Sequence, residues 1–542
     1  MLNKILQDRL KAAVEAVEKD VYAVYKELHT HPELSLQEYN TSRLIRSVVK
    51  GYGDYAEPLS IGPTGLLYEL QGEAEGAGKA ILLRADMDAL PLQEDTDHEV
   101  RSEVAGVMHA CGHDSHTSIL LGTMRVLASL KKQIAGTVYF FFQPAEEGLN
   151  GAKFLLQTAG VPLEKIDVVC ACHMMPDLYA GEIGLQSGAL LASSDTFDIT
   201  VNGKGGHGAH PYTTVDPVMI AAGLVQQLQN LVAREVCALD SAVISVCSIH
   251  SEGNAYNIIP DKVHLRGTIR TLEPATRKYL QKRVKEVCEH FCAAQRATSE
   301  VTILEGPPFL HNDAAWVAKA QEVLAPVLGA ENIKQLKIAT MGAEDFAYIK
   351  ERYPGIFIRI GCRTQGKAFT PIHSGRFTVD RKALTSGMLT MAGMVLDFCQ
   401  QGAAKMVNKF YEVTVPQGED IKKILTAFIL QQGWKNVYVT GAIGSVIDMV
   451  FTTPVQNHLP LRCGRVPVSA AGEIVQFCGE VMPIEKMPPE LEDIYPDKDS
   501  PLFVHIHAAC AIAGGHVIGG GLSSGRAFRA LRIFMVPLDD VA

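Results

Sequence analysis

Ala80-Ile-Leu-Leu-Arg-Ala-Asp-Met-Asp88 decides the fold, because an apolar run of strand length leads directly into two carboxylates. Three further apolar runs have the same character, Thr137–Phe142, Asp167–Cys172 and Ile356–Ile360. Runs of four to eight apolar residues are typical of buried strands. The sequence therefore predicts strands that are buried on both faces, as in a parallel sheet.

Amphipathic stretches separate these strands. In residues 1–50 apolar side chains recur at three- and four-residue spacing, which is typical of helices. We expect further helices at 115–130, with Asp114 or Ser115 as the N-cap, and at 380–399. Strands alternating with helices indicate an α/β domain with a mixed, mostly parallel sheet and helices on both faces.

Residues 195–305 follow a different pattern. The expected order is β-α-β-β-α-β, with strands near 196–202, 242–250, 262–271 and 299–304 and helices near 216–231 and 275–294. This order is that of a ferredoxin-like α+β domain. Because the first pattern resumes after residue 310, we expect residues 195–305 to be an inserted domain. Residues 1–194 and 306–400 then form one catalytic domain.

The last part of the chain has a third composition. Residues 401–406 read as a linker, and residues 407–542 are rich in short strands and Gly/Pro turns. We therefore expect a separate C-terminal α+β domain.

Composition excludes several classes of protein. The 542 residues carry a net charge of −10, which argues against a partner recognised by phosphate neutralisation, so no nucleic-acid partner is expected. The sequence has no uninterrupted apolar run of 18 residues, and its N-terminus is charged throughout, so neither a membrane partner nor export is expected. We expect a cytoplasmic protein whose 12 cysteines are reduced and mostly buried.

Metal-capable side chains gather where the predicted strands end. Ligands of open α/β sheets bind beyond the carboxyl ends of the strands. The residues that follow these strands or lie just before a helix are Asp86, Asp88, Cys111, His113, Glu146, Glu147, His173 and His373. Their convergence on one edge predicts a metal site.

The spacing within this group suggests separate roles. Cys111 and His113 are two residues apart, so on an extended segment they point the same way, and the following helix N-terminus favours a thiolate. Such a ligand set suits zinc, manganese, cobalt or nickel. Glu146 and Glu147 diverge if extended, so that one binds metal and the other takes a proton from water. Alternatively, the cysteine is a buried apolar residue, the glutamates form a solvated face and the histidines are surface residues.

The chain resembles a metallopeptidase family that contains aminoacylases, hippurate hydrolase, succinyl-diaminopimelate desuccinylase and glutamate carboxypeptidase. It is most similar to the N-acyl-amino-acid amidohydrolases, which include plant auxin-conjugate hydrolases. The matching motifs run through residues 1–400 in order: Leu28–Leu34, Arg84–Pro91, Met108–Asp114, Phe142–Gly148, Gly203–His207, Asn257–Pro260, Gly342–Phe346 and Pro371–His373.

The resemblance implies a site with two divalent metal ions per subunit, Mn²⁺ or Zn²⁺. It implies the ligands Cys111, His113, Glu147, His173 and His373, with Glu146 as general base and Asp88 orienting the site. The inserted domain matches a lid that also dimerises. His207 then reaches the partner subunit's site and binds the oxyanion, and Asn257 and Arg270 contact the substrate carboxylate. Without the resemblance, His207 reads as a flexible loop histidine and Arg270 as a surface ion pair.

The expected activity is hydrolysis of the amide bond of N-acyl amino acids, carrying acetyl, benzoyl or similar acyl groups, by a metal-activated water. A dipeptidase or carboxypeptidase of the same family is an alternative. Another is a non-catalytic regulator that binds small molecules, but the intact Glu146 and the five expected ligands argue against it.

The C-terminal segment resembles the plant-and-prokaryote-conserved domain, best known beside AT-hooks. The resemblance rests on Leu502–Ala508, with His505 and His507 on one face, and on Gly514-Gly515 before His516. Gly521 occupies the place where the family shows a histidine, so buried or interfacial histidines are favoured over a three-histidine metal site. The nearest approach to an AT-hook, Cys463–Pro467, lacks its first Arg. Bacterial relatives of this domain generally form trimers. If the lid dimerises and this domain trimerises, closed symmetry requires at least a hexamer.

Overall fold

The computed structural model of the protein describes residues 2–74, 78–148, 150–253, 255–400, 411–454, 463–487, 500–514 and 516–538. The chain divides into two compact units, residues 1–403 and 404–542. The expected linker at 401–406 lies outside the described residues. No helix in the described part of the chain is long and apolar enough to cross a membrane.

The first unit is built on an eight-stranded sheet, which confirms the mixed α/β fold. The strands follow the order β1 (Leu59–Ile61), β2 (Gly65–Gln71), β4 (Gly136–Gln143), β3 (Lys79–Asp86), β5 (Val168–Tyr179), β16 (Gly355–Arg363), β6 (Ile183–Leu185) and β15 (Ile333–Gln335). The four central strands are parallel to one another, and antiparallel pairings join β2 and β6 to them. Two short strands, β7 (Gly188–Leu191) and β14 (Leu310–Asn312), pair separately.

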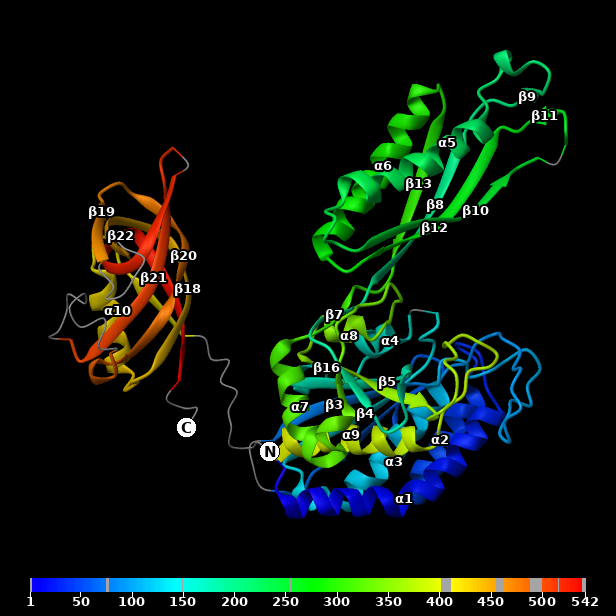
Figure 1. Ribbon diagram of the computed structural model, residues 1–542, viewed down its shortest axis with the longest axis horizontal. Helices are drawn as coiled ribbons and strands as arrows, with labels where there is room; N and C mark the ends of the chain where they lie inside the picture. The colour runs from blue at the N-terminus through cyan, green and yellow to red at the C-terminus, as the bar shows by residue number, and fades with distance from the viewer. Residues whose placement is uncertain are drawn as a thin grey trace. The chain divides into compact units, whose positions relative to one another are not determined.

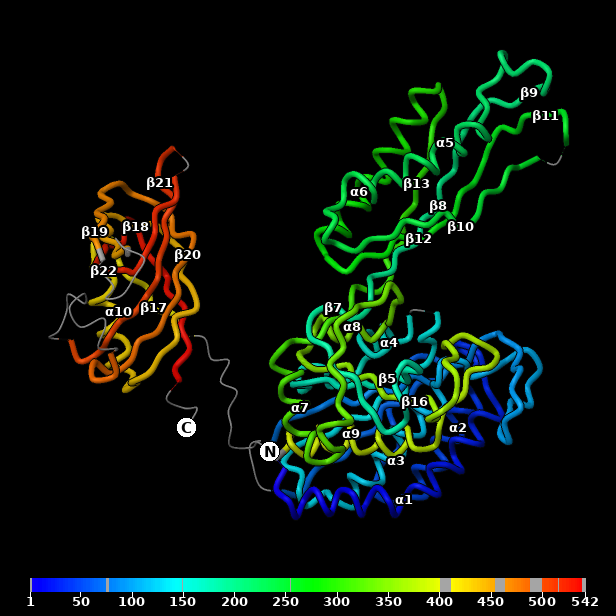
Figure 2. Tube along the Cα trace, in the orientation of Figure 1, coloured from blue at the N-terminus to red at the C-terminus, as the bar shows by residue number. Residues whose placement is uncertain are grey.

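Helices cover both faces of this sheet, because its strands carry apolar residues on both sides. One core packs against the helices α1 (Lys4–Thr30), α2 (Tyr39–Tyr52), α3 (His113–Ser129), α7 (Ala314–Leu328) and α9 (Lys382–Gln400). A smaller core contacts α4 (Gly151–Gln157) and α8 (Ala347–Lys350). Figure 2 shows the first helix of the unit, α1, beside its last helix, α9. Chain segments at opposite ends of the unit therefore share one core.

Two helix expectations need correction. Residues 1–50 contain two helices, α1 and α2, separated by a non-helical stretch. The helix expected at 115–130 begins at His113, and its N-cap is Gly112. Asp114 lies inside the first turn, where its side chain accepts hydrogen bonds from the Ser115 N–H at 2.7 Å and from His29 at 2.6 Å. Because the helix begins one residue before Asp114, neither Asp114 nor Ser115 is its N-cap.

The inserted domain has the ferredoxin-like order expected from sequence. Its elements are β8 (Ser193–Asn202), α5 (Pro217–Asn230), β10 (Ala242–Ser251), β12 (Lys262–Thr271), α6 (Pro274–Ala294) and β13 (Thr298–Glu305), with the antiparallel sheet order β10-β12-β8-β13. Figure 1 shows this domain joined to the body through β8 and β13. The ribbon of β9 (Gly206–His207) and β11 (Ile258–Ile259) lies at the opposite end. We call this end the lid tip.

In its described residues, the second unit is a six-stranded antiparallel sheet with one α-helix. Its elements are β17 (Tyr411–Val415), α10 (Ile421–Gln431), β18 (Val437–Pro454), β19 (Cys463–Val468), β20 (Gly472–Pro483), β21 (Leu502–Ile512) and β22 (His516–Pro537). His505 and His507 share a face of β21, with ring centroids 5.0 Å apart. The register places Gly521 opposite His507 and His516 opposite Ile512, so the hairpin does not bring His516 beside the pair.

Candidate metal centre and active site

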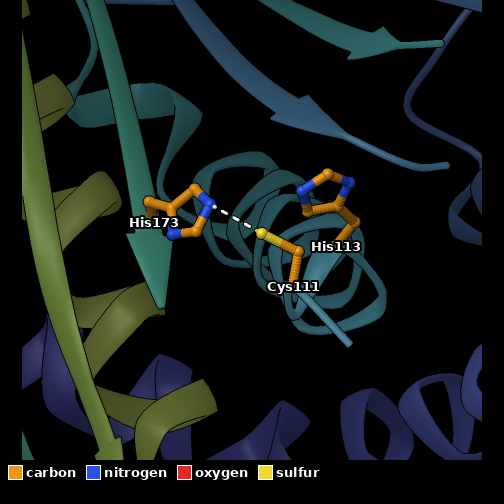
Figure 3. A group of neighbouring side chains, drawn as sticks. All are labelled: Cys111, His113 and His173. Carbon is orange, nitrogen blue, oxygen red and sulfur yellow. Dashed lines mark hydrogen bonds between the residues drawn. The ribbon is translucent and has the colours of Figure 1, made fainter. Parts of the chain in front are cut away.

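The side chains expected at the sheet edge lie together in the structure. Within the described residues, Cys111, His113 and His173 place one ligand atom each within 4.8 Å of one another, and so do Cys111, Glu147 and His373. Cys111 belongs to both groups. Figure 3 shows its thiol pointing at the His173 ring, and the Cys111 Sγ to His173 Nε2 distance is 3.4 Å. The five expected ligands therefore form one continuous cluster of donors.

Cys111 and His113 meet through a turn, so the extended geometry expected for them is wrong. Gly112 between them has φ +90°, a left-handed conformation that favours glycine. A Cβ at Gly112 would lie 2.8 Å from Met174 Cγ, so there is no room for a side chain. The turn places Cys111 just before α3 and His113 in its first turn. His173 lies inside β5 and not beyond its end, because the strand continues to Tyr179.

Glu146 and Glu147 diverge as expected, but they lie in a turn and not in an extended segment. Ala145 before them has φ +51°, a conformation that costs a non-glycine residue free energy and is concentrated at functional sites. Glu147 Oε1 lies 3.3 Å from His373 Nε2. Glu146 Oε1 instead accepts the backbone N–H of Asp345 at 3.4 Å. One carboxylate thus joins the donor cluster and its neighbour turns toward Asp345.

A backbone hydrogen bond fixes the position of His373. Its φ is +60°, and its N–H donates to the carbonyl oxygen of Ala110 at 2.8 Å. This hydrogen bond ties the loop after β16 to the residue before Cys111. Two donors far apart in the sequence are therefore fixed to the same backbone.

Asp88 holds several parts of the donor cluster in place through hydrogen bonds. Its carboxylate accepts the N–H groups of Glu146 at 3.1 Å and Glu147 at 3.0 Å. It also pairs with His113 Nδ1 at 3.2 Å and accepts the Ser35 hydroxyl at 2.6 Å. The side chain binds the backbone of both glutamates and the far nitrogen of one imidazole, which is the position expected for an orienting residue.

The donor cluster fits divalent cations. His113 Nε2 and Glu147 Oε1 are buried and find no hydrogen-bond partner among the described residues. Buried polar atoms without partners are rare, because they lose their hydration with no compensation. An imidazole nitrogen, a thiol and a carboxylate oxygen facing one another are donors that zinc and manganese accept.

Burial and charge shift the acid–base properties of these groups. Burial, together with the carboxylates of Glu344 and Asp345, raises the pKa of Glu146 well above its usual range. Contacts with Cys111 and Glu147 raise the pKa of His373 to about 10, whereas burial lowers the pKa of His173. Burial also raises the pKa of the Cys111 thiol. Burial therefore opposes the thiolate that the helix N-terminus is expected to favour.

A network of buried charges adjoins the cluster, and the sequence did not predict it. The fully buried Arg84 guanidinium contacts Asp86 at 2.6 Å, Glu344 at 2.7 Å and Asp345 at 3.1 Å. Asp86 in turn pairs with His116 Nδ1 at 2.6 Å, and His116 Nε2 accepts the Met174 N–H at 2.8 Å. The feature of the sequence that could have indicated this network is an arginine inside an apolar strand, followed two residues later by an aspartate.

The donor cluster opens into a cavity of about 440 Å³, whose wall includes Cys111, Glu146, Glu147, His173 and His373. Arg270 reaches this cavity from the lid. His207 and Asn257 do not line it; both are exposed at the lid tip, where the Gly208 N–H donates to the Asn257 carbonyl at 2.7 Å. The expected reach of His207 into a partner's site and the expected contact of Asn257 with the substrate carboxylate stay predictions.

The fold and the site define a hydrolase-type α/β domain with an inserted lid and a cluster of metal donors at its sheet edge. Residues 82–397 match the profile of Peptidase family M20/M25/M40, and the chain belongs to this family of amide-bond hydrolases. Residues 403–539 match the Plants and Prokaryotes Conserved (PCC) domain. Both resemblances expected from sequence are confirmed.

Curated relatives span the first unit. The chain is 37% identical to N-acetylcysteine deacetylase of Bacillus subtilis, over 66% of this chain and 92% of the relative. It is 35% identical to IAA-amino acid hydrolase ILR1-like 2 of Arabidopsis thaliana, over 72% of this chain and 88% of the relative. It is also 35% identical to thermostable carboxypeptidase 1 of Saccharolobus solfataricus, over 72% of this chain and 99% of the relative.

A solved structure shares the fold. It is a Bacillus subtilis protein described as a dinuclear metal-binding peptidase of the M20 family, with a TM-score of 0.61 and 33% identity. The match covers 71% of this chain and 99% of that chain.

Proposed function

We propose that the protein is a metal-dependent amidohydrolase that hydrolyses the amide bond of N-acyl amino acids. The observation that carries this proposal is the position of Glu146: a buried carboxylate with a raised pKa, beside a cluster of metal donors, in a cavity that Arg270 also lines. A carboxylate with a raised pKa is a stronger base than an ordinary one. The deacetylase and the amino-acid conjugate hydrolase among the relatives support the same reaction.

Two divalent ions, Mn²⁺ or Zn²⁺, fit the donors. The residues that would hold them are Cys111, His113, Glu147, His173 and His373. A relative of known structure is described as dinuclear. When bound, such ions polarise the amide carbonyl and acidify a water.

The chain's own residues supply proton transfer and binding. Glu146 accepts the proton of the attacking water, because its carboxylate faces the cavity and burial favours its protonated form. The same carboxyl group then protonates the leaving amine nitrogen. Arg270 binds the substrate carboxylate through its guanidinium. His207 of the partner subunit stabilises the oxyanion.

Replacing Glu146 by Gln tests the proposal. The amide keeps the shape of the side chain but cannot accept a proton, so we expect turnover to fall by at least about 100-fold. Metal content, measured by elemental analysis, should stay at the wild-type value. Glu146→Asp is the matched control, and it should retain more activity than Glu146→Gln. Full activity of Glu146→Gln would exclude Glu146 as the base.

A carboxypeptidase or dipeptidase activity is the second candidate, favoured by the carboxypeptidase relative. Hydrolysis of N-acetyl, N-benzoyl and dipeptide substrates by the metal-loaded protein separates the two. Faster hydrolysis of the dipeptides would favour the second candidate. A wild-type protein that binds these compounds without hydrolysing any of them would favour a non-catalytic regulator.

A further inference from the structure

Arg359 is a buried cation in the wall of the active-site cavity. It lies on β16 opposite His173 in the parallel pairing with β5, so both side chains leave the same face of the sheet. Only 5% of Arg359 is exposed, and the residue lines the cavity together with His173 and Phe357. Arg359 therefore borders the space in which a substrate amide would bind.

Arg359 forms no ion pair with any residue that the structure describes. Its one hydrogen bond within the described part of the chain runs from Nη2 to the Leu190 carbonyl at 3.3 Å. Arg84 is also buried, but three carboxylates surround it. Asp177 is the nearby acid, but it is exposed at the cavity. Burial lowers the pKa of Arg359, and Asp177 opposes that shift. An arginine nevertheless keeps its charge in proteins.

A second guanidinium faces the same cavity. Arg270 projects from β12 of the lid, and its Nε donates to Thr268 Oγ1 at 3.0 Å. It too has no ion pair among the described residues, because the nearby Asp195 is bound by Arg277. Of the acids in the cavity wall, Glu146 and Glu147 adjoin the metal donors and Glu344 binds Arg84. Asp177 is exposed and forms no ion pair with either arginine among the described residues.

Charges buried without a counter-charge are costly, so a buried cation that faces a cavity indicates an anionic ligand. Guanidinium groups bind carboxylates through two parallel hydrogen bonds. A substrate with one carboxylate pairs with one arginine and leaves the other unpaired. A substrate with two carboxylates pairs with both.

We propose that Arg359 forms a second carboxylate subsite, so that the preferred substrates are N-acyl amino acids with two carboxylates. This inference rests on the proposed hydrolase function, in which Arg270 binds the first carboxylate. The second carboxylate belongs either to the amino-acid side chain, as in N-acetylglutamate, or to the acyl group, as in N-succinylalanine. Both sources present the same chemistry to Arg359.

Two matched pairs of substrates test the subsite: N-acetylglutamate against N-acetylglutamine, and N-succinylalanine against N-butanoylalanine. For the full metal-loaded chain we expect kcat/KM to favour the acidic member of one pair by at least about tenfold. In Arg359→Leu this ratio should fall about 10- to 100-fold, as for the loss of a charge-assisted hydrogen bond. The pair that responds identifies the source of the carboxylate.

Arg363→Leu is the matched control. Arg363 lies on the same strand, but its guanidinium stacks on Tyr179 at 4.3 Å and lies outside the cavity lining. Its removal should leave the acid-to-neutral ratio at the wild-type value. An equal loss for both members of each pair in Arg359→Leu, or an unchanged ratio, would overturn the subsite. A wild-type enzyme that prefers neither N-acetylglutamate nor N-succinylalanine over its neutral counterpart would also overturn the subsite.

Calorimetric binding of glutarate and butyrate separates this inference from the proposed function. Arg359→Leu should weaken the binding of glutarate at least about tenfold more than that of butyrate, whether or not the chain hydrolyses amides. A wild-type chain that hydrolyses no N-acyl amino acid refutes the function, and the glutarate result still decides the role of Arg359. Equal weakening of both ligands would refute the subsite.

Discussion

Asp88 and His113 are joined through the imidazole nitrogen that faces away from the donor cluster. Asp88 Oδ1 lies 3.2 Å from His113 Nδ1, and His113 Nε2 is left buried without a partner among the described residues. An ionised carboxylate can only accept, so the contact holds a proton on Nδ1 and leaves Nε2 as the nitrogen available to a metal ion. The pairing thereby prepares His113 as a metal ligand.

Asp88→Asn should lower metal affinity about 10- to 100-fold, the usual effect of removing a carboxylate behind a liganding histidine. The amide retains one acceptor oxygen, whereas the carboxylate binds His113 and the N–H groups of both Glu146 and Glu147. Competition with a chelator measures the change. Ser35→Ala removes only the hydroxyl that donates to Asp88 and should have a smaller effect. Wild-type affinity in Asp88→Asn would show that Asp88 does not orient the site.

Cys111→Ala should remove more metal than the loss of either His173 or His373. Cys111 belongs to the donor group with His113 and His173 and to the group with Glu147 and His373. We expect elemental analysis to find close to no bound metal in Cys111→Ala and about one ion in His173→Ala or His373→Ala. An equal metal content in all three variants would mean that Cys111 serves one ion only.

Much of this site could be predicted from sequence, because its donors follow apolar runs that are recognisable as strands. Asp86, Glu146 and Glu147 lie at the strand ends where the sheet topology predicts them. The local geometry could not be predicted. The turn at Cys111 depends on a left-handed Gly112 packed against Met174, and the turn at Glu146 depends on a left-handed Ala145. Neither conformation is visible in residue spacing.

Long-range pairing limits sequence-based prediction in the same way. Arg84 binds Glu344 and Asp345, which lie about 260 residues away, and no periodicity links them. Arg359 is similar: in the sequence it is one polar residue in an apolar strand, and only the pairing with β5 places it beside His173. The fold class follows from local pattern, whereas the charge partners of buried residues require the tertiary structure.

Arg84→Met should destabilise the protein by about 3–5 kcal/mol, because the change leaves buried carboxylates without a counter-charge. Urea unfolding followed by near-ultraviolet circular dichroism measures the loss. Arg125→Met is the control, since Arg125 pairs with Asp20 on the surface and should cost less than about 1 kcal/mol. Equal stability of the two variants would show that the Arg84 network contributes nothing to folding.

The buried His29 should make stability depend on alkaline pH. Burial opposes its charge, but hydrogen bonds to Asp114 and Glu94 raise the pKa of His29 from 6.5 to about 10. Below about pH 6.5 the imidazole is protonated in the folded and unfolded states, and the ion pairs contribute fully. As pH rises toward about 10 only the folded state keeps the proton, so this contribution declines and is lost above that value.

The stability difference between wild type and His29→Gln should therefore shrink as pH increases from 6.5 to about 10. Urea unfolding at a series of pH values gives this difference directly. His31→Gln removes an exposed imidazole two residues away and should follow the wild type. A difference that is constant with pH would show that His29 is not charged in the folded protein.

His207 provides a test of the lid as a bridge between subunits. It lies at the exposed lid tip and does not line its own cavity, so an effect of His207→Ala on turnover would act on another subunit. We expect this variant to lose at least about 100-fold in kcat, the usual effect of losing one oxyanion donor. Mixing it with Glu146→Gln after subunit exchange decides the route. In a mixed dimer, the site with an intact Glu146 receives an intact His207 from its partner, so about one quarter of the wild-type activity should return. If His207 acts within its own subunit, each site of the mixed dimer lacks one of the two residues and no activity should return.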